Sequence, residues 1–196
     1  DIIDANGEII RCSRQENAEL FEWTIGGMGL TGVILRAAIR LRAVETGWIK
    51  QTTIPAANLD EAMAIFEQSQ DATYSVAWID CLRTDEHLGR SLVMLGEHAK
   101  VDGLSQNQAR APFDTNAKRK LSVPIDFPSW ALNRYSIRAL NTLYYGNGLR
   151  NSGEHIVDWD NYFYPLDAIL GWNRIYGRKG FLQFQCVIPL DQSRAG

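Results

Sequence analysis

Apolar and polar residues alternate along three stretches of the chain, residues 48–54, 73–81 and 91–98, as they do on half-buried β-strands. Between the first two stretches, apolar residues recur near helical spacing from Leu59 to Phe66, directly after Asn58, a good N-cap residue. The order strand, helix, strand, strand predicts the α+β class, with an antiparallel sheet covered by helices.

The residues before this unit carry a different pattern. Two short apolar runs flank Asn6-Gly7, which predicts a hairpin with a tight type I′ turn over residues 2–10. Residues 33–42 then alternate apolar and basic side chains, which predicts a half-exposed strand. We place a boundary near Val44–Gly47, and expect one domain over residues 1–46 and a second over residues 47–196.

The second half of the chain is less regular. Residues 102–128 are polar and contain proline, and predict no regular element; an irregular stretch of this length is often functional or mobile. Residues 129–145 have helical periodicity, residues 147–160 predict a loop with at most a short strand, and residues 181–189 predict a strand that ends at a proline.

Composition excludes several classes of protein. Hydrophobic residues make up 45% and charged residues 22% of the 196 residues, as in ordinary globular proteins. Lys and Arg number 20 against 23 Asp and Glu, a net charge of −3, so the basic footprint of a nucleic-acid-binding protein is missing. No apolar run approaches the roughly 20 residues of a membrane-spanning helix, so no transmembrane segment is expected.

The cysteines and histidines do not predict a metal site. Cys12, Cys81 and Cys186 are odd in number and far apart, which argues against a disulfide framework and favours a reducing compartment such as the cytoplasm. The three histidines show no metal-ligand spacing either.

The glycine cluster Gly26–Gly32 contains the string GxGxxG from Gly27 to Gly32. That string marks a dinucleotide site when a strand precedes it and a helix follows it, but here the next residues are strand-like. A tight structural turn and a cofactor loop therefore remain equal alternatives from the residues alone.

Three features near the C-terminus and in the middle of the chain could bind a ligand. Gln183 and Gln185 share one face of the predicted strand, where their amides would suit a hydroxyl-rich ligand, although an exposed polar face explains them as well. Trp172 and Arg174 follow a run of aromatic residues, an arrangement that suits sugars or anions but equally a packed core with a surface arginine. Trp78 on its strand is most simply a core residue.

Together these motifs resemble a known family. Residues 20–34 resemble the end of the FAD-binding domain of vanillyl-alcohol-oxidase-type flavoenzymes. Residues 74–80, 163–167, 171–177 and 180–185 resemble segments of that family's ribose oxidases, which act on a lipid-linked sugar. The matching segments keep the same order over nearly the whole chain.

The resemblance implies an FAD-dependent oxidoreductase that oxidises a sugar hydroxyl to a ketone by hydride transfer to the flavin. It places Gly29, Gly32 and Ile34 beside FAD, and it implies that the substrate pocket is lined by Trp78, Phe163, Leu166, Trp172, Arg174, Gln183 and Gln185. Phe163 departs from the family, whose ribose oxidases tend to carry Tyr there, so the substrate or its affinity could differ.

The resemblance also implies parts that these residues do not supply. The family's diphosphate-binding loop would precede residue 1, and its catalytic lysine would follow residue 196, so no catalytic residue is assigned here. We expect the tail of an FAD-binding domain, most of a substrate-binding domain, no activity from this piece alone, a sugar or lipid-linked sugar substrate and a reductase partner subunit. The alternative is a stand-alone, non-enzymatic module that binds a carbohydrate or another small molecule.

Overall fold

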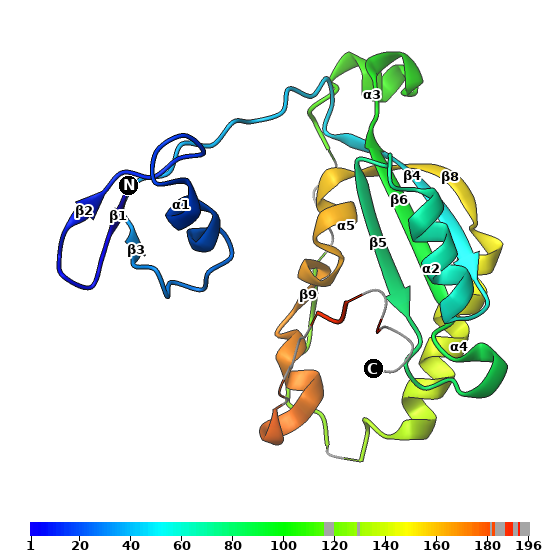
Figure 1. Ribbon diagram of the computed structural model, residues 1–196. Helices are drawn as coiled ribbons and strands as arrows, with labels where there is room; N and C mark the ends of the chain where they lie inside the picture. The colour runs from blue at the N-terminus through cyan, green and yellow to red at the C-terminus, as the bar shows by residue number, and fades with distance from the viewer. Residues whose placement is uncertain (116–119, 129, 181, 183–186, 190–191, 193–196) are drawn as a thin grey trace. The chain divides into compact units, whose positions relative to one another are not determined.

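The computed structural model describes residues 1–115, 120–128, 130–180, 182, 187–189 and 192. The chain divides into two compact units, residues 1–43 and 44–196, which are described separately. Figure 1 shows a small unit around α1 and a larger one around β4, β5 and β6. The assignment of residues 1–46 and 47–196 to an FAD-binding and a substrate-binding domain stays a prediction.

The first unit holds a three-stranded antiparallel sheet and one helix. Its strands are β1 (Ile2–Ile3), β2 (Ile9–Ile10) and β3 (Val33–Ile34), in the order β2-β1-β3. The helix is α1 (Ala18–Thr24), and Ile2 on the central strand is the buried residue of this sheet.

The hairpin of this unit is confirmed, but its predicted tight type I′ turn at Asn6-Gly7 is wrong. The Gly7 amide donates to the Asp4 carbonyl at 3.1 Å, and the Asp4 amide donates to the Glu8 carbonyl at 3.0 Å. Among residues 4–8, only Gly7 has a positive φ, of 83°. The hairpin is therefore closed by a turn that is followed by a glycine in the left-handed conformation. The Asp4 carboxylate selects this longer loop, because it accepts hydrogen bonds from the amides of Asn6 and Glu8.

The strand expected over residues 33–42 is much shorter than predicted. Only Val33 and Ile34 pair, opposite Ile3 and Ile2, and residues 35–42 form no regular element. Alternation alone does not make a strand, because each strand also needs a partner for its backbone hydrogen bonds.

The second unit is built on a four-stranded antiparallel sheet. Its strands are β4 (Trp48–Ala56), β5 (Tyr74–Ile79), β6 (Ser91–His98) and β8 (Gly153–Asp158), in the order β5-β6-β4-β8. The alternating stretches thus form strands as predicted, and the α+β class with an antiparallel sheet is confirmed. β8 lies where at most a short strand was expected, and it pairs with β4 over six residues. Ile49 and Val93, on β4 and β6, are fully buried.

Three helices pack on this sheet. α2 (Leu59–Gln68) contacts β4 and β6, and Asn58 caps it as predicted, accepting from the Glu61 amide at 2.9 Å. α4 (Arg134–Arg150) begins and ends five residues later than the periodicity suggests, and its start is set by Asn133, which forms its capping box. α5 (Trp159–Phe163) follows β8 directly.

Close contacts at two glycines show which face of the sheet α4 and α5 cover. A Cβ atom at Gly148 of α4 would meet the Leu92 side chain, and one at Gly96 of β6 would meet the Tyr162 ring of α5. Leu92 and Gly96 are four residues apart on β6 and so share a face. α4 and α5 therefore cover the same face of the sheet.

The remaining elements are short. They are η1 (Asp85–His87), η2 (Val101–Gly103), α3 (Gln106–Arg110), β7 (Leu121–Ser122), η3 (Pro165–Ala168), β9 (Ile169–Leu170) and η4 (Trp172–Lys179). In its described residues, 102–115 and 120–128, the irregular stretch is thus interrupted only by short elements. The strand predicted over residues 181–189 falls largely outside the described residues. Within the described part of the chain, no helix combines the length and apolar character needed to cross a membrane.

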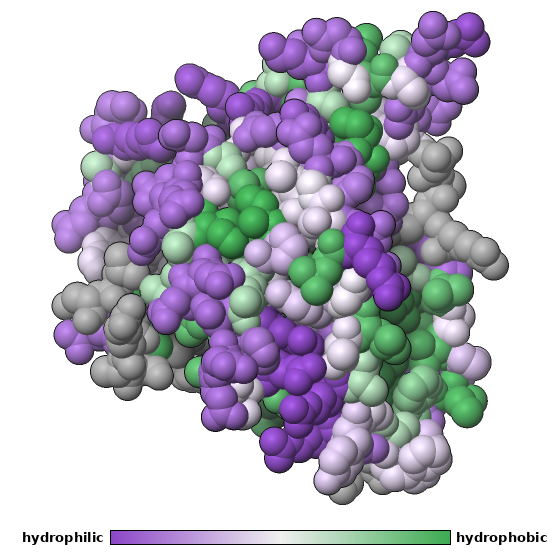
Figure 2. Space-filling model, turned by 90° about the vertical axis from the view of Figure 1, so that its right-hand side faces the viewer, coloured by the Kyte–Doolittle hydropathy of each residue, from purple (hydrophilic) through white to green (hydrophobic). Residues whose placement is uncertain are grey.

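Large apolar side chains also reach the surface. On α4, Tyr135 and Leu143 are 83% and 73% exposed, while Asn141 and Tyr145 point to the sheet through their hydrogen bonds. Figure 2 shows apolar side chains lying among hydrophilic ones on one side of the molecule. α4 therefore carries apolar side chains on a second flank as well as on the packed one.

The two glycines inside α4 provide a matched test of how closely this helix packs. A Cβ atom at Gly148 would lie 2.2 Å from Cδ1 of the buried Leu92, whereas one at Gly146 meets nothing within 4 Å. We expect Gly146→Ala to raise the free energy of unfolding by about 0.5–1 kcal/mol through helix propensity. Gly148→Ala should lower it by about 1–3 kcal/mol through overpacking. Urea unfolding followed by circular dichroism measures both; equal shifts in the same direction would contradict the packing of α4.

Candidate functional site

The predicted cofactor side lies in the first unit. Ile34 on β3 lines a cavity of about 740 Å³, together with Gly26 from the glycine cluster. Neither Gly29 nor Gly32 is among its lining residues. Their contact with a cofactor stays a prediction.

The structure gives Gly32 a role of its own. Its φ is 135°, and a Cβ atom there would lie 2.3 Å from the Ile3 carbonyl oxygen. Gly32 is therefore needed for the close approach of the glycine turn to β1. Gly29 also has a positive φ, of 79°, but a Cβ atom there would meet nothing within 4 Å.

The lining of this cavity combines charged, hydroxyl-bearing and apolar groups. Arg11 and Arg36 supply two guanidinium groups, Asp1 supplies one carboxylate, Ser13 and Thr24 the hydroxyl groups, and Phe21, Ile25 and Ile34 apolar surface. The Arg11 guanidinium also forms an exposed ion pair with Glu16 at 3.6 Å. Such a set fits a nucleotide, whose phosphates need cations and whose rings need apolar contact.

Of the predicted substrate residues, Trp78 lies on β5 and Phe163 contacts the same strand through Tyr74. Tyr74 and Trp78 are four residues apart on β5 and so point to one face. The Trp78 ring packs on Tyr144 of α4 with centroids 4.7 Å apart, and the Phe163 ring meets Tyr74 edge-on at 4.9 Å. These rings form an aromatic surface on the face of the sheet that α4 and α5 cover.

Sequence reasoning missed the part that Tyr74 plays, although the same alternation that singled out Trp78 includes it. Besides the contact with Phe163, the Tyr74 hydroxyl forms a hydrogen bond with Nε2 of His98 at 3.2 Å. Next to it, the Tyr162 hydroxyl donates to the Met94 carbonyl at 3.2 Å, and burial raises the pKa of Tyr162. These polar contacts hold the rings that surround Phe163.

Leu166, Trp172 and Arg174 belong to the segment after α5 and not to the sheet. Leu166 lies on η3 and is exposed, and the Trp172 ring meets Tyr176 on η4 at 6.0 Å. Nη1 of Arg174 donates to the carbonyls of Val123 and Pro124 at 3.2 and 2.7 Å. The other two predicted substrate residues, Gln183 and Gln185, lie outside the described residues.

A second cavity, of about 560 Å³, lies in the larger unit. It is lined by Lys50, His98, Ala99, Lys100, Asp102, Gly103, Glu154, His155 and Ile156. Lys50 and Glu154 form an ion pair across β4 and β8 at 2.8 Å. None of the predicted substrate residues lines this cavity, so their assignment to one pocket stays a prediction.

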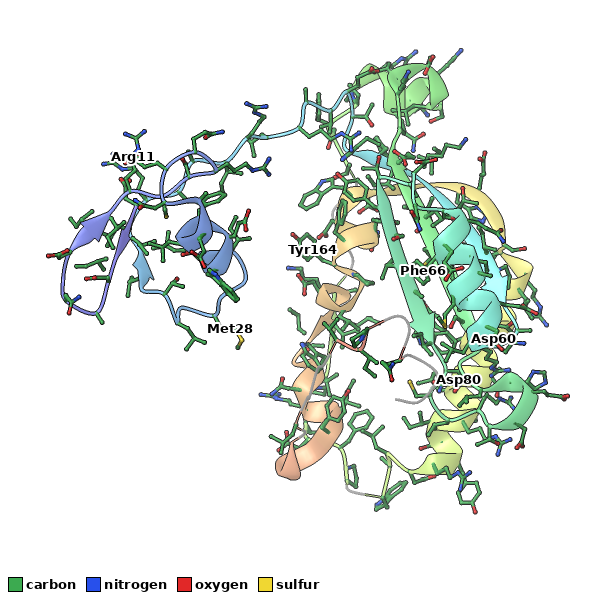
Figure 3. The ribbon with its side chains drawn as sticks, in the orientation of Figure 1. Arg11, Met28, Asp60, Phe66, Asp80 and Tyr164 are labelled. Atoms are coloured by element: carbon green, nitrogen blue, oxygen red, sulfur yellow. The ribbon has the colours of Figure 1, made fainter. Side chains whose placement is uncertain are left out.

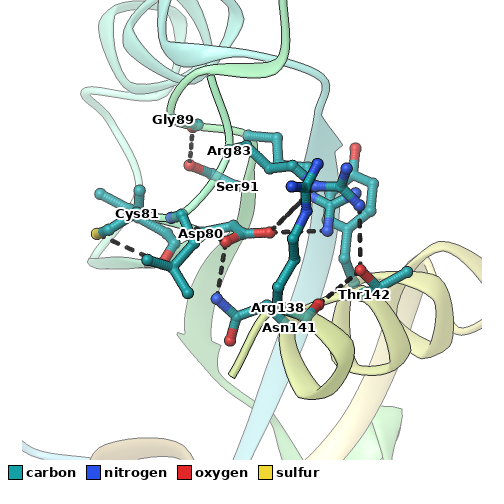
Figure 4. A network of polar contacts seen from close by, with 12 residues as sticks. Asp80, Cys81, Arg83, Gly89, Ser91, Arg138, Asn141 and Thr142 are labelled. Carbon is teal, nitrogen blue, oxygen red and sulfur yellow. Dashed lines mark hydrogen bonds and ion pairs between the residues drawn. The ribbon is translucent and has the colours of Figure 1, made fainter. Parts of the chain in front are cut away.

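A buried carboxylate lies two residues beyond Trp78, at the end of β5 (Figures 3 and 4). Asp80 has no exposed surface, and Nε and Nη2 of Arg90 donate to its Oδ2 at 2.9 and 2.7 Å. Nδ2 of Asn141, on α4, donates to Oδ1 at 2.7 Å. Asp80 therefore joins the end of β5, the start of β6 and helix α4.

Arginine and tyrosine side chains extend this network. Nε of Arg83 lies 3.7 Å from the Asp80 carboxylate, and its Nη2 donates to the Thr142 hydroxyl at 3.0 Å. The Arg90 guanidinium also lies 4.5 Å above the ring of Tyr145. The sequence signal for this network is weak, since an Asp after a strand and an Arg before the next are common.

Opposing effects act on the pKa of Asp80. Burial raises it, but the hydrogen bonds from Asn141, Arg90 and the Leu82 amide, with the charge of Arg90, outweigh burial and lower it below its usual value. The ionised form thus stabilises the folded state. This contribution is fully present above the unfolded pKa of about 3.9 and is lost as pH falls through the lower folded pKa.

Replacing Asp80 tests this network. We expect Asp80→Asn to lower the free energy of unfolding at pH 7 by about 3–5 kcal/mol, because Arg90 is left buried without its counter-charge. The gap to the wild type should narrow as pH falls from about 3.9, where the carboxyl of the unfolded chain becomes protonated, through the lower pKa of the folded state. Urea unfolding at pH 7 and pH 3 measures the difference in the free energy of unfolding, and Asp71→Asn, at an exposed position, is the control. A gap that stays constant with pH would contradict the assignment.

The sequence was compared with known proteins. No model of a protein family matches it. Decaprenylphosphoryl-β-D-ribose oxidase of Mycolicibacterium smegmatis is 34% identical over 97% of this chain, and the match covers 42% of that protein. An uncharacterised protein of Streptomyces coelicolor, from the mprA 5′ region, is 32% identical over 65% of the chain and 34% of its own length.

Plant oxidoreductases match a shorter stretch. Cytokinin dehydrogenase 5 of Arabidopsis thaliana is 40% identical over 26% of this chain and 10% of its own length. The chain spans less than half the length of each of these relatives. The resemblance of the sequence to FAD-dependent oxidoreductases is confirmed, and the chain is related over nearly all of its residues to decaprenylphosphoryl-β-D-ribose oxidase.

Proposed function

We propose that these residues form the substrate-side part of an FAD-dependent oxidoreductase that oxidises a hydroxyl group of a lipid-linked ribose or a similar sugar to a ketone. The identity of 34% over 97% of the chain to an oxidase of decaprenylphosphoryl-β-D-ribose carries this proposal. The relative's name supplies the substrate class, and the aromatic surface on β5 is the feature of this chain that suits it.

The cofactor would lie against the first unit. Its cavity of about 740 Å³ is lined by Ile34 and by two arginines, Arg11 and Arg36. Apolar side chains beside a ring system and guanidinium groups beside phosphates are the contacts that such a cofactor requires. When bound, FAD would accept the hydride that leaves the sugar carbon.

The work of this chain would be to bind and orient the sugar. Trp78 and Phe163 would supply apolar and ring surface, on which the faces of sugars pack, and the fixed rings of Tyr74 and Tyr144 would hold them in place. Orientation matters for hydride transfer, because a displacement of about 1 Å can cost a factor of about 100 in rate. The group that takes the hydroxyl proton is not assigned to this chain.

Trp78 gives the sharpest test of this proposal. In the flavin-containing enzyme, we expect Trp78→Ala to lower kcat/KM for decaprenylphosphoryl-ribose by about tenfold or more, since the substrate loses an orienting ring. Trp130→Ala is the control, because Trp130 is 76% exposed and is not among the predicted substrate residues. Bleaching of the flavin absorbance under anaerobic conditions measures the reductive step; equal rates for both variants would overturn the role of Trp78.

The alternative is a binding module that works without flavin. It would explain the aromatic surface on β5 with no redox chemistry. Isothermal titration calorimetry of the 196 residues with pentoses and pentose phosphates separates the two. Submillimolar binding without flavin, with no flavin reduction in the longer protein, would favour the module.

A further inference from the structure

Two segments far apart in the sequence lie side by side in the larger unit. We call them the paired segments, residues 121–127 and 169–177. Strands β7 and β9 pair in parallel between them, with Leu121 opposite Ile169 and Ser122 opposite Leu170, and the Val123 amide donates to the Leu170 carbonyl at 2.9 Å. A ladder this short is marginal by itself, so other contacts must hold the segments together.

Arg174 supplies most of these contacts. Its Nη1 donates to the Val123 carbonyl at 3.2 Å and to the Pro124 carbonyl at 2.7 Å. Its own carbonyl accepts from the Phe127 amide at 2.9 Å. One residue thus binds the other segment at three positions, and the bonds from the guanidinium are strengthened by its charge.

Two glycines show that the paired segments touch backbone to backbone. Gly177 has a φ of 64°, and a Cβ atom there would lie 2.7 Å from the Phe127 carbonyl oxygen. Gly171 has a φ of 68°, and its Cβ atom would lie 3.4 Å from the Val123 carbonyl oxygen. The chain of residues 169–177 is therefore shaped to fit residues 121–127 on both sides of Arg174.

Resting on the proposed function, we propose that Arg174 is a positioning residue: through Val123 and Pro124 it fixes the paired segments and so the place of the Trp172 ring beside the sugar. Both hydrogens of Nη1 are committed to backbone carbonyls, so this nitrogen has no donor left for a substrate. Trp172 lies two residues before Arg174 on the same short helix, and its ring meets the Tyr176 ring edge-on at 6.0 Å.

Hydrogen exchange tests the positioning step without flavin or turnover. The amides of Val123 and Phe127 should exchange at least about tenfold faster in Arg174→Gln, while those of β4 and β6 keep the wild-type rates. Arg174→Lys should restore part of the protection, because an ammonium group can still reach a carbonyl. Arg110→Gln, an exposed arginine on α3, is the matched control.

Exchange rates at Val123 and Phe127 that equal the wild type in both Arg174 variants would overturn the proposal. If Arg174→Gln does not fold, Gly177→Ala disturbs the same junction at the Phe127 carbonyl and should show the same local loss of protection. Unchanged exchange in that variant counts equally against it.

Kinetics of the flavin-containing enzyme test the consequence for the substrate. We expect Arg174→Lys to raise KM several-fold with kcat nearly unchanged, and the effects of Arg174→Gln and Trp172→Ala on kcat/KM to be less than additive. Additive effects would mean that the two residues act separately and would overturn the positioning role. A wild-type enzyme that oxidises no sugar would refute the proposed function, while the exchange result would stand.

Discussion

The packing of β5, β6 and α4 in the larger unit depends on the buried charge of Asp80. A carboxylate removed from water costs several kcal/mol unless it is paired and hydrogen-bonded, and Asp80 has no exposed surface. Arg90 and Asn141 must therefore lie where they do, which fixes the start of β6 and the docking of α4 against the end of β5. Since α4 carries Tyr144, the same charge also determines what packs on Trp78.

The predicted substrate residues are divided between two kinds of structure. Trp78 lies on a strand of the continuous four-stranded sheet, where β4 and β6 pair over eight residues. Trp172 and Arg174 lie on a segment tied to its neighbour by a two-residue ladder, a guanidinium and close backbone contacts. A substrate that contacted both would meet the continuous sheet on one side and, on the other, a segment that few hydrogen bonds hold in place.

The regular part of the fold could be predicted because its signals are local. Alternation identified β4, β5 and β6, and the side chain of Asn58 marked the start of α2. The prediction failed where pairing with a neighbouring strand decides whether a segment forms a strand. Residues 35–42 alternate, but the pairing with β1 ends at Ile34 and they form no strand. β8 lies where a loop with at most a short strand was predicted, and it is a six-residue strand because it pairs with β4. The type I′ turn does not form because the Asp4 carboxylate favours a longer loop, and the rule that predicted the turn considers only the two residues Asn6 and Gly7.

By itself, the sequence determined the class of the fold and the family resemblance, and through that resemblance it predicted residues that would meet a sugar and a flavin. The class follows from periodicity and the resemblance from short motifs, which are properties of neighbouring residues. Only the tertiary structure decided what those residues touch. It showed that Gly32 serves a close approach to Ile3, that Arg174 binds backbone carbonyls, and that Asp80 joins two strands to a helix. Contacts of this kind join residues some 30 to 60 positions apart, and their geometry depends on how the whole chain folds.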